Sequence, residues 1–342
     1  MSRKPVSPRA DADLTGPDRA VRALGLAAAV VPVLALCFLA AEMVQDSVPA
    51  ILYSGSHLVT GQTFTFGSLY ASTLTVQHGI RAPHGATYGA LTLIVGTLVS
   101  SMLALALALP LSVGAMLALV ERVPNRLQGG LSAFIELLAG IPSVVYGFWG
   151  VLVLGPLLAQ HLYPPLTRLG VVLPFFRGPV GAGEGLLTTA IVLAVMIVPI
   201  IAATTRELLR TVPLLAREGA MALGLSPLET VRVVTIPFIR RGILAAAILG
   251  WARALGETMA VLMISGNFLG SLPGNIYAPF STIASTIVAL LDSALTDPTG
   301  MAAHALAAIG LILLAITLVT NLLGRLLIRR VSGGPLPIGR GI

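Results

Sequence analysis

Six long apolar runs constrain this chain more than any other feature of its sequence. A helix needs about 20 predominantly apolar residues to cross the hydrocarbon core of a bilayer. The runs reach that length at about residues 23–44, 88–120, 131–159, 186–205, 242–265 and 301–324. Only 10% of the residues are charged, whereas a soluble domain carries about 25%. The sequence therefore predicts an all-α membrane protein with six transmembrane helices.

The arginines indicate which side of the membrane each loop faces. By the positive-inside rule, the short loops that are richest in Arg and Lys are cytoplasmic. Both tails and the loops after the second and fourth runs are basic, whereas the opposite loops hold only Arg81, Arg168 and Arg177. We therefore predict that both termini are cytoplasmic. This orientation also explains the net charge of +7, so we expect no nucleic-acid partner.

The chain is predicted to contain one membrane domain between two short tails. We expect residues 1–22 to be a disordered cytoplasmic tail, residues 23–328 to form the transmembrane domain, and residues 329–342 to be a second cytoplasmic tail. Three outer segments are rich in Gly, Pro, Ser and Thr, at about 45–87, 160–185 and 266–300. They are expected to be loop-like, with room for short helices at the membrane interface.

A polar and basic segment at about residues 206–241 separates the fourth and fifth runs. Its composition predicts two short helices joined by an elbow. The first is expected to end at Gly224, where a left-handed residue suits a helix C-terminus. Ser226 and Glu229 then predict a capping box for the second helix, which Pro237 is expected to end or kink. A structured loop in such an apolar chain indicates a docking site for another protein.

Small residues recur at intervals of four in two of the runs. In lipid, such stripes let helix backbones approach closely, because packing drives the association of helices there. They are compatible with a seam beside a translocation path and equally with plain bundle packing. The stripes are Gly96, Ser100, Ala104, Ala108 and Ser112 in the second run, and Gly242, Ala246, Gly250 and Ala254 in the fifth.

Two ionisable residues, Arg253 and Glu257, lie within the fifth run. A charge at the centre of a span costs about 2.5–3.5 kcal/mol on insertion scales. Because the two residues are four apart, we expect them on one helix face, where they can pair. The pair is either a structural ion pair or a polar station at which Arg253 meets an oxyanion while Glu257 holds the arginine. Glu136, near the cytoplasmic start of the third run, is expected to be structural.

Sequence signatures of catalysis are absent. The chain has no G-x-x-x-x-G-K-[ST] phosphate loop, and Lys4 is its only lysine, so we do not expect it to hydrolyse ATP. It also lacks a G-x-S-x-G elbow and an H-E-x-x-H helix. The histidines are scattered, and Cys37 is the only cysteine. We therefore expect no catalytic residue, no metal site and no cofactor bound by this chain.

The polar loop resembles the EAA loop of bacterial ABC importer permeases, whose pattern is E-A-A-x-x-x-G-x9-I-x-L-P. Four residues match this pattern in position: Glu218, Ala220, Gly224 and Pro237. Three others depart mildly from it: Gly219 replaces the first Ala, Val234 the Ile and Ile236 the Leu. The loop by itself indicates an importer permease without indicating its substrate.

Three further stretches are similar to the PstC-type permease subunit of the bacterial phosphate ABC importer, at 88–101, 134–149 and 248–267. The likeness extends over about residues 20–330, and GETMAV at 256–261 favours this subunit over its sister, PstA. The resemblance implies a type I (MetI-like) ABC importer permease fold in the bacterial inner membrane.

The same resemblance implies partners and residue roles. It implies a heterodimer with a PstA-like permease subunit, a cytoplasmic PstB-like ATPase dimer that uses ATP and Mg, and an extracytoplasmic PstS-like protein that delivers inorganic phosphate. It also implies that Arg253 and Glu257 take part in phosphate passage. Coupling to the ATPase is implied for Glu218, Ala220, Gly224 and Pro237.

Other functions remain alternatives at this point. A permease for another oxyanion, such as sulfate or molybdate, would share the same elbow. The docking elbow and the missing second half-repeat argue against an ion-gradient-driven carrier. The lack of a nucleophile or metal constellation argues against a membrane-embedded enzyme. We therefore predict the lipid-embedded permease subunit of an ATP-driven phosphate importer.

Overall fold

Long helices dominate the computed structural model, which describes residues 16–69 and 73–331. Among these residues, six helical segments are long and apolar enough to cross a membrane. They are Leu24–Ser54, Leu91–Arg122, Ser143–Val171, Leu186–Arg210, Pro227–Leu255 and Met301–Arg330. The prediction of six spans is therefore confirmed, although two of the predicted boundaries are wrong, as described below.

Helix α8 (Leu186–Arg210) is the central helix of the bundle and the most buried of the six spans. Helices α3 (Leu91–Arg122) and α11 (Ile236–Leu255) both pack against it. Their small-residue stripes form these contacts. Ala104 and Ala108 of α3 share a core cluster with Ile197 and Ile201 of α8. A Cβ atom added at Gly250 of α11 would lie 2.9 Å from the Ile201 side chain.

The two ends of the small-residue stripe in α3 contact different parts of the protein. Ser112 Oγ donates a hydrogen bond to the Val198 carbonyl of α8, at 3.2 Å. Gly96, at the other end of the same stripe, lies against the Ser281 carbonyl of an outer segment. Because close approach needs small side chains at these positions, the expected helix packing is confirmed. A role of the stripes beside a translocation path stays a prediction.

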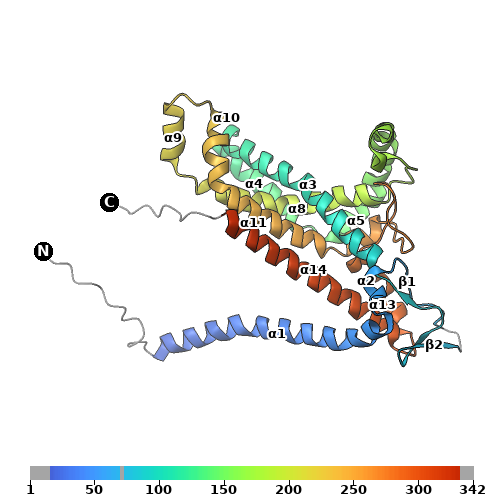
Figure 1. Cartoon of the computed structure of the whole chain (residues 1–342). Coiled ribbons are helices and arrows are strands. Elements are labelled where there is room, and N and C mark those ends of the chain that lie inside the picture. Colours follow the sequence, from blue (N-terminus) through green and yellow to red (C-terminus); the bar gives the residue numbers. More distant parts are fainter. Residues whose placement is uncertain (1–15, 70–72, 332–342) are drawn as a thin grey trace.

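Helix α1 (Gly16–Ser54) stands apart from the bundle over most of its length (Figure 1). It contacts α14 (Met301–Val331) near its own C-terminal end. Residues 16–22 of the predicted N-terminal tail are helical, and residues 1–15 lie outside the described part. Helix α14 likewise continues to Val331, and residues 332–342 lie outside it. Helix α1 begins and α14 ends at the same end of the molecule as α9 (Figure 1).

The third span begins later than the sequence indicates. The run at 131–159 predicts one helix, but α4 (Asn125–Ala139) ends before Pro142, and α5 (Ser143–Trp149) begins after it. Proline lacks the N–H that a continuing helix needs and disfavours helical geometry in the residue before it. The span then continues through η1 (Gly150–Leu154), α6 (Gly155–Leu157), η2 (Leu158–Leu162), α7 (Tyr163–Arg168) and η3 (Leu169–Val171).

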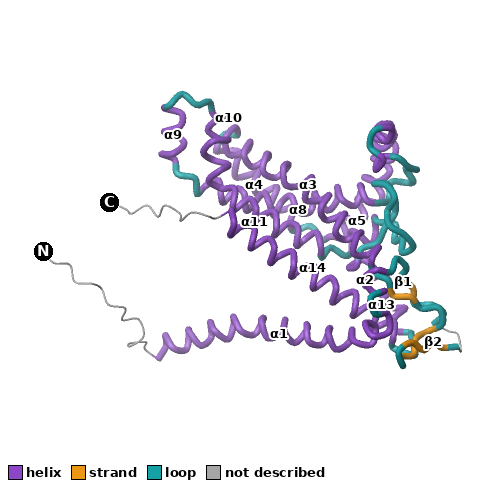
Figure 2. The backbone as a smooth tube through the Cα atoms, viewed as in Figure 1, coloured by secondary structure: helices purple, strands orange, loops and turns teal. Residues whose placement is uncertain are grey.

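Short strands and helices gather at the end of the bundle opposite α9 (Figure 2). Strand β1 (Phe64–Thr65) pairs with β4 (Thr87–Tyr88), and β2 (Leu74–Gln77) pairs with β3 (Ile80–Pro83), both in antiparallel register. The remaining short helices there are α2 (His57–Thr60), η4 (Pro174–Phe176) and α13 (Ile283–Leu295). The outer segments therefore contain short helices, which the sequence allows for, and also short strands, which it does not predict.

Candidate functional site

The elbow between α8 and α11 begins with α9 (Leu214–Ala222), which ends as the sequence predicts. Gly224 has a φ of +87°, a left-handed conformation that glycine adopts without steric cost. Its N–H donates to the Met221 carbonyl at 2.9 Å, and the Leu225 N–H donates to the Ala220 carbonyl at 3.3 Å. These two bonds form a Schellman motif, so Gly224 fixes the direction in which the chain leaves α9.

The second elbow helix, α10 (Pro227–Thr230), begins with the predicted capping box. The Ser226 N–H donates to Glu229 Oε2 at 2.8 Å, and the Glu229 N–H donates to Ser226 Oγ at 3.4 Å. Of the two alternatives expected for Pro237, that it ends or kinks this helix, the first is wrong. A π turn, η5 (Val231–Thr235), joins α10 to α11, and the helix continues through Pro237 to Leu255. A π turn is a common site of helix irregularity, and here it ends two residues before the proline.

Large apolar side chains are exposed on the elbow. Helix α9 stands apart from the long helices (Figure 1), with 82% of Leu215 and 84% of Leu223 exposed. Glu218 and Gly224 are exposed as well, whereas Ala220 is buried. An apolar patch with a charged neighbour is typical of a surface that contacts another protein. We call the exposed residues Leu214, Leu215, Glu218, Met221, Leu223 and Leu228 the elbow surface.

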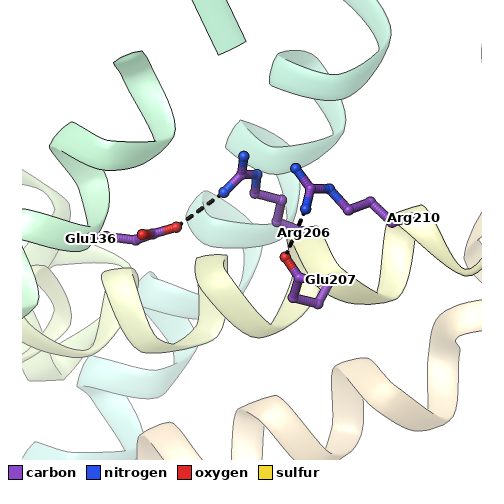
Figure 3. A network of polar contacts seen from close by, with 4 residues as sticks. All are labelled: Glu136, Arg206, Glu207 and Arg210. Atoms are coloured by element: carbon purple, nitrogen blue, oxygen red, sulfur yellow. Dashed lines mark hydrogen bonds and ion pairs between the residues drawn. The ribbon is translucent and has the colours of Figure 1, made fainter. Parts of the chain in front are cut away.

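Ion pairs join helices near the elbow. Arg206 of α8 donates to Glu136 Oε1 of α4 at 3.0 Å, and the two side chains point toward one another (Figure 3). Arg210 and Glu207, also drawn in Figure 3, pair at 3.3 Å within α8 itself. Glu136 therefore ties α4 to the central helix, in agreement with the structural role expected for it.

The fifth span ends earlier than the sequence indicates. The sequence predicts one helix over 242–265, but α11 ends at Leu255, and α12 (Met259–Ile264) begins after Gly256, Glu257 and Thr258. Glycine is about 1 kcal/mol less favourable than alanine in a helix interior, so Gly256 is a weak point at which the helix can stop. The expectation that Arg253 and Glu257 share one continuous helix is therefore wrong.

The two residues nevertheless pair, as expected. Arg253 Nη2 lies 3.7 Å from Glu257 Oε2. The Glu257 side chain is only 3% exposed, whereas 52% of the Arg253 side chain is exposed. The buried Glu257 carboxylate thus contacts one side of the guanidinium, and about half of the Arg253 side chain is left uncovered by this chain. The exposed part of the Arg253 guanidinium, close to the end of a membrane span, requires a polar partner or a water-filled space, since lipid does not solvate a charge.

The structure adds nothing that would hold a metal ion within residues 16–69 and 73–331. Groups of three or more His, Cys, Asp or Glu side chains with suitable geometry do not occur in that part of the chain. Cys37 is exposed on α1. The residues that stand out by chemistry are therefore the elbow surface and the Arg253–Glu257 pair.

These features define a class of protein: a polytopic membrane protein with an exposed apolar elbow at one end and an ion pair where the fifth span ends. The family described as "Binding-protein-dependent transport system inner membrane component" matches residues 110–333, and the chain belongs to this family. It is therefore a multi-pass permease component of a transport system rather than an enzyme.

Curated relatives and a solved structure agree with this assignment. The chain is 51% identical over 326 residues to "Phosphate transport system permease protein PstC 1" of Mycobacterium tuberculosis, covering 94% of this chain and 96% of the relative. It is 40% identical over 248 residues to "Phosphate transport system permease protein PstC" of Haemophilus influenzae, covering 72% and 77%. The predicted similarity to PstC-type permeases is thus confirmed.

The fold is also found in a solved transporter. A chain from the "Crystal structure of a bacterial ABC transporter involved in the import of the acidic polysaccharide alginate" aligns with a TM-score of 0.54 at 17% identity, covering 91% of this chain and 97% of that one. The predicted fold class, an ABC importer permease of type I (MetI-like), is confirmed.

Proposed function

We propose that this chain is the membrane-spanning permease subunit of an ATP-driven phosphate importer. The observation that carries the proposal is the half-exposed Arg253, held by a buried Glu257 just beyond the end of the fifth span, in a chain whose curated relatives are phosphate transport permeases. A guanidinium suits a tetrahedral oxyanion because its planar donors form charge-assisted hydrogen bonds. Glu257 neutralises the arginine when no anion is present.

The exposure of Arg253 favours a path that this chain does not enclose alone. A half-exposed arginine near the end of a membrane span needs polar surroundings that a second subunit can supply. We therefore propose that a PstA-like permease subunit completes the path opposite Arg253. In this arrangement Glu257 is a positioning residue, and Arg253 is the group that touches the anion.

The elbow surface is proposed to bind a cytoplasmic ATPase dimer of the PstB type, which uses ATP and Mg. Exposed leucines around Glu218 supply the apolar contact, and a charged residue in their midst fixes the register of binding. Gly224 sets the direction of the chain, Ala220 anchors α9 from its buried side, and Pro237 lies two residues after the π turn. The beginning of α1 and the end of α14 lie at the elbow end (Figure 1), which supports cytoplasmic termini.

The opposite end is proposed to receive a PstS-like phosphate-binding protein from outside. Two β-ladders and α13 give this end a structured surface. It includes a cavity of about 240 Å³ whose lining contains Glu184, Asn275 and Tyr277. Polar side chains in a concave surface suit a contact with another protein, and this end faces away from the elbow.

The proposal is tested by reconstituting the chain into proteoliposomes with its permease, ATPase and binding-protein partners. Uptake of labelled phosphate is expected only when all partners and internal ATP are present. Phosphate uptake by this chain without an ATPase would contradict the proposal and favour an ion-gradient-driven carrier. ATP-dependent uptake of sulfate or molybdate in place of phosphate would favour a permease for another oxyanion.

A further inference from the structure

Arg217 of α9 links the elbow to two other parts of the protein. Its Nη2 donates to Glu121 Oε1, in the last turn of α3, and the two residues lie 96 positions apart in the sequence. Its Nε donates to Thr235 Oγ1, in the π turn η5, at 3.4 Å. One guanidinium therefore joins α9, α3 and the base of the fifth span.

The surroundings of this link are loosely packed. A cavity of about 390 Å³ separates the end of α3 from α10 and η5. Its lining includes Leu117 and Glu121 on one side, and Leu228 and Val231 on the other. Where a cavity replaces side-chain contact, dispersion attraction between the elements is lost. The Arg217–Glu121 pair therefore supplies a specific connection where packing is incomplete.

The pair is also partly shielded from water. The exposed fractions of the Arg217 and Glu121 side chains are 18% and 27%, whereas Arg210 and Glu207 are largely exposed. Salt and water screen an exposed pair strongly, and a shielded one much less. Glu218, next to Arg217 in the chain, is exposed. Arg217 thus faces the bundle while its neighbour lies on the elbow surface.

Both elements that Arg217 contacts continue toward the proposed substrate path. Helix α3 packs along the central helix α8 through its small-residue stripe. The π turn leads directly into α11, which carries Arg253. A π turn contains one residue more than a regular turn and is a point at which a helix can change register. A displacement of α9 would therefore reach two helices through one side chain.

We propose that Arg217 is a positioning residue that transmits movement of the elbow to α3 through Glu121 and to the fifth span through Thr235. The inference rests on the proposed function, because it assumes that an ATPase moves the elbow. It assigns to Arg217 a role distinct from docking: the elbow surface binds the partner, and Arg217 carries the resulting displacement into the membrane bundle.

The test uses the complete complex in proteoliposomes and measures phosphate taken up per ATP hydrolysed. Arg217→Gln and Glu121→Gln are each expected to leave assembly and ATP hydrolysis intact while lowering this ratio roughly fivefold or more, the lower end of typical coupling between sites. The charge-reversed pair Arg217→Glu with Glu121→Arg is expected to recover much of the ratio. Arg217→Lys keeps the charge and is expected to recover it in part.

Arg210→Gln and Glu207→Gln are matched controls, because they remove an exposed pair from the same end of the bundle, and their ratio is expected to equal that of the unmodified complex. If Arg217→Gln and Glu121→Gln both leave the ratio of phosphate uptake to ATP hydrolysis unchanged, the role of Arg217 is overturned but the proposed function is not. Loss of ATPase binding in these variants would also overturn it, since Arg217 would then serve docking. An unmodified complex without ATP-dependent phosphate uptake would overturn both this inference and the proposed function.

Discussion

The Glu257 carboxylate lies 3.7 Å from the Arg253 guanidinium, and the chain buries the carboxylate while leaving about half of the arginine side chain exposed. This asymmetry matters because a purely structural pair inside one bundle would be expected to shield both charges. The break between α11 and α12 produces it, since Glu257 leaves the helical path just after Leu255. Arg253 is thereby held on one side and open on the other.

Replacement of Arg253 tests its proposed contact with the anion. Arg253→Gln is expected to reduce phosphate uptake about 10- to 100-fold, because a hydrogen bond to a charged group contributes about 1.5–3 kcal/mol. Arg253→Lys should keep part of the activity, since it retains the charge but loses the planar donor set. Uptake rates and co-purification of the complex are measured together. Normal uptake with Arg253→Gln would leave the pair a structural one.

Replacement of Gly224 tests whether its left-handed turn orients the elbow for binding of the ATPase. Gly224→Val should disturb the left-handed turn, since a β-branched residue at a φ of +87° is strained, and should weaken binding of the ATPase while insertion in the membrane stays normal. Gly224→Asn is the matched control, because asparagine tolerates this conformation. Both variants are compared by co-purification with the ATPase. Equal ATPase binding by the two would show that this turn does not direct docking.

The contact between Gly250 and Ile201 predicts a loss of stability on enlargement. Gly250→Ala places a Cβ atom 2.9 Å from the Ile201 side chain, and overpacking of this kind costs about 1–3 kcal/mol. The control is Gly114→Ala in α3, where a Cβ atom would meet nothing within 4 Å. Thermal unfolding of the detergent-solubilised chain should show a lower midpoint for Gly250→Ala only. Equal unfolding midpoints for the two variants would mean that α11 and α8 can move apart without a loss of stability.

Tyr88, near the β-structured end, predicts a dependence of stability on pH. Burial raises the pKa of its phenol well above the ordinary range, and the hydroxyl has no hydrogen-bond partner within the described part of the chain. The ionisation of this phenol therefore does not affect the free energy of unfolding below the unfolded-state pKa of about 10, and it lowers that free energy as the pH rises above about 10.

Tyr88→Phe removes this group. Because a buried hydroxyl without a partner is unfavourable, the variant should be at least as stable as the original at neutral pH. It should also lose less stability between neutral pH and about pH 11. Thermal unfolding at the two pH values measures both effects. A variant that is less stable at neutral pH would show that the hydroxyl has a favourable contact after all.

Local signals in the sequence predicted several elements well. The left-handed Gly224 and the capping box of Ser226 and Glu229 depend on a few neighbouring residues, so the sequence determines them directly. The small-residue stripes of α3 and α11 depend only on helical periodicity. The six spans follow from apolar length, which the bilayer thickness imposes.

Other features could not be read from hydropathy. The apolar run at 131–159 conceals the break at Pro142, because proline changes backbone geometry without making the run polar. Residues 74–83 form a hairpin in which His78 and Gly79 both have positive φ, as a two-residue turn of type I′ requires. The pair His78-Gly79 is therefore the sequence signal for this hairpin.

Contacts between residues that are far apart in the sequence could not be predicted from local sequence patterns. Nothing in the sequence indicates that Arg217 meets Glu121, since the two are brought together only by the packing of α3 and the elbow. The unequal burial of Arg253 and Glu257 also depends on the helix break at Gly256. The contact of Arg217 with Glu121 supports the role proposed for Arg217. The unequal burial of Arg253 and Glu257 supports the proposed path shared with a second subunit.

The most direct test of the central claim is competition for uptake of labelled phosphate by the reconstituted complex. If the path at Arg253 carries phosphate, excess unlabelled phosphate and arsenate should both suppress ATP-dependent uptake, whereas excess sulfate or molybdate should leave it unchanged. Suppression by sulfate or molybdate comparable to that by unlabelled phosphate would contradict the account, because the complex would then select oxyanions in general rather than phosphate.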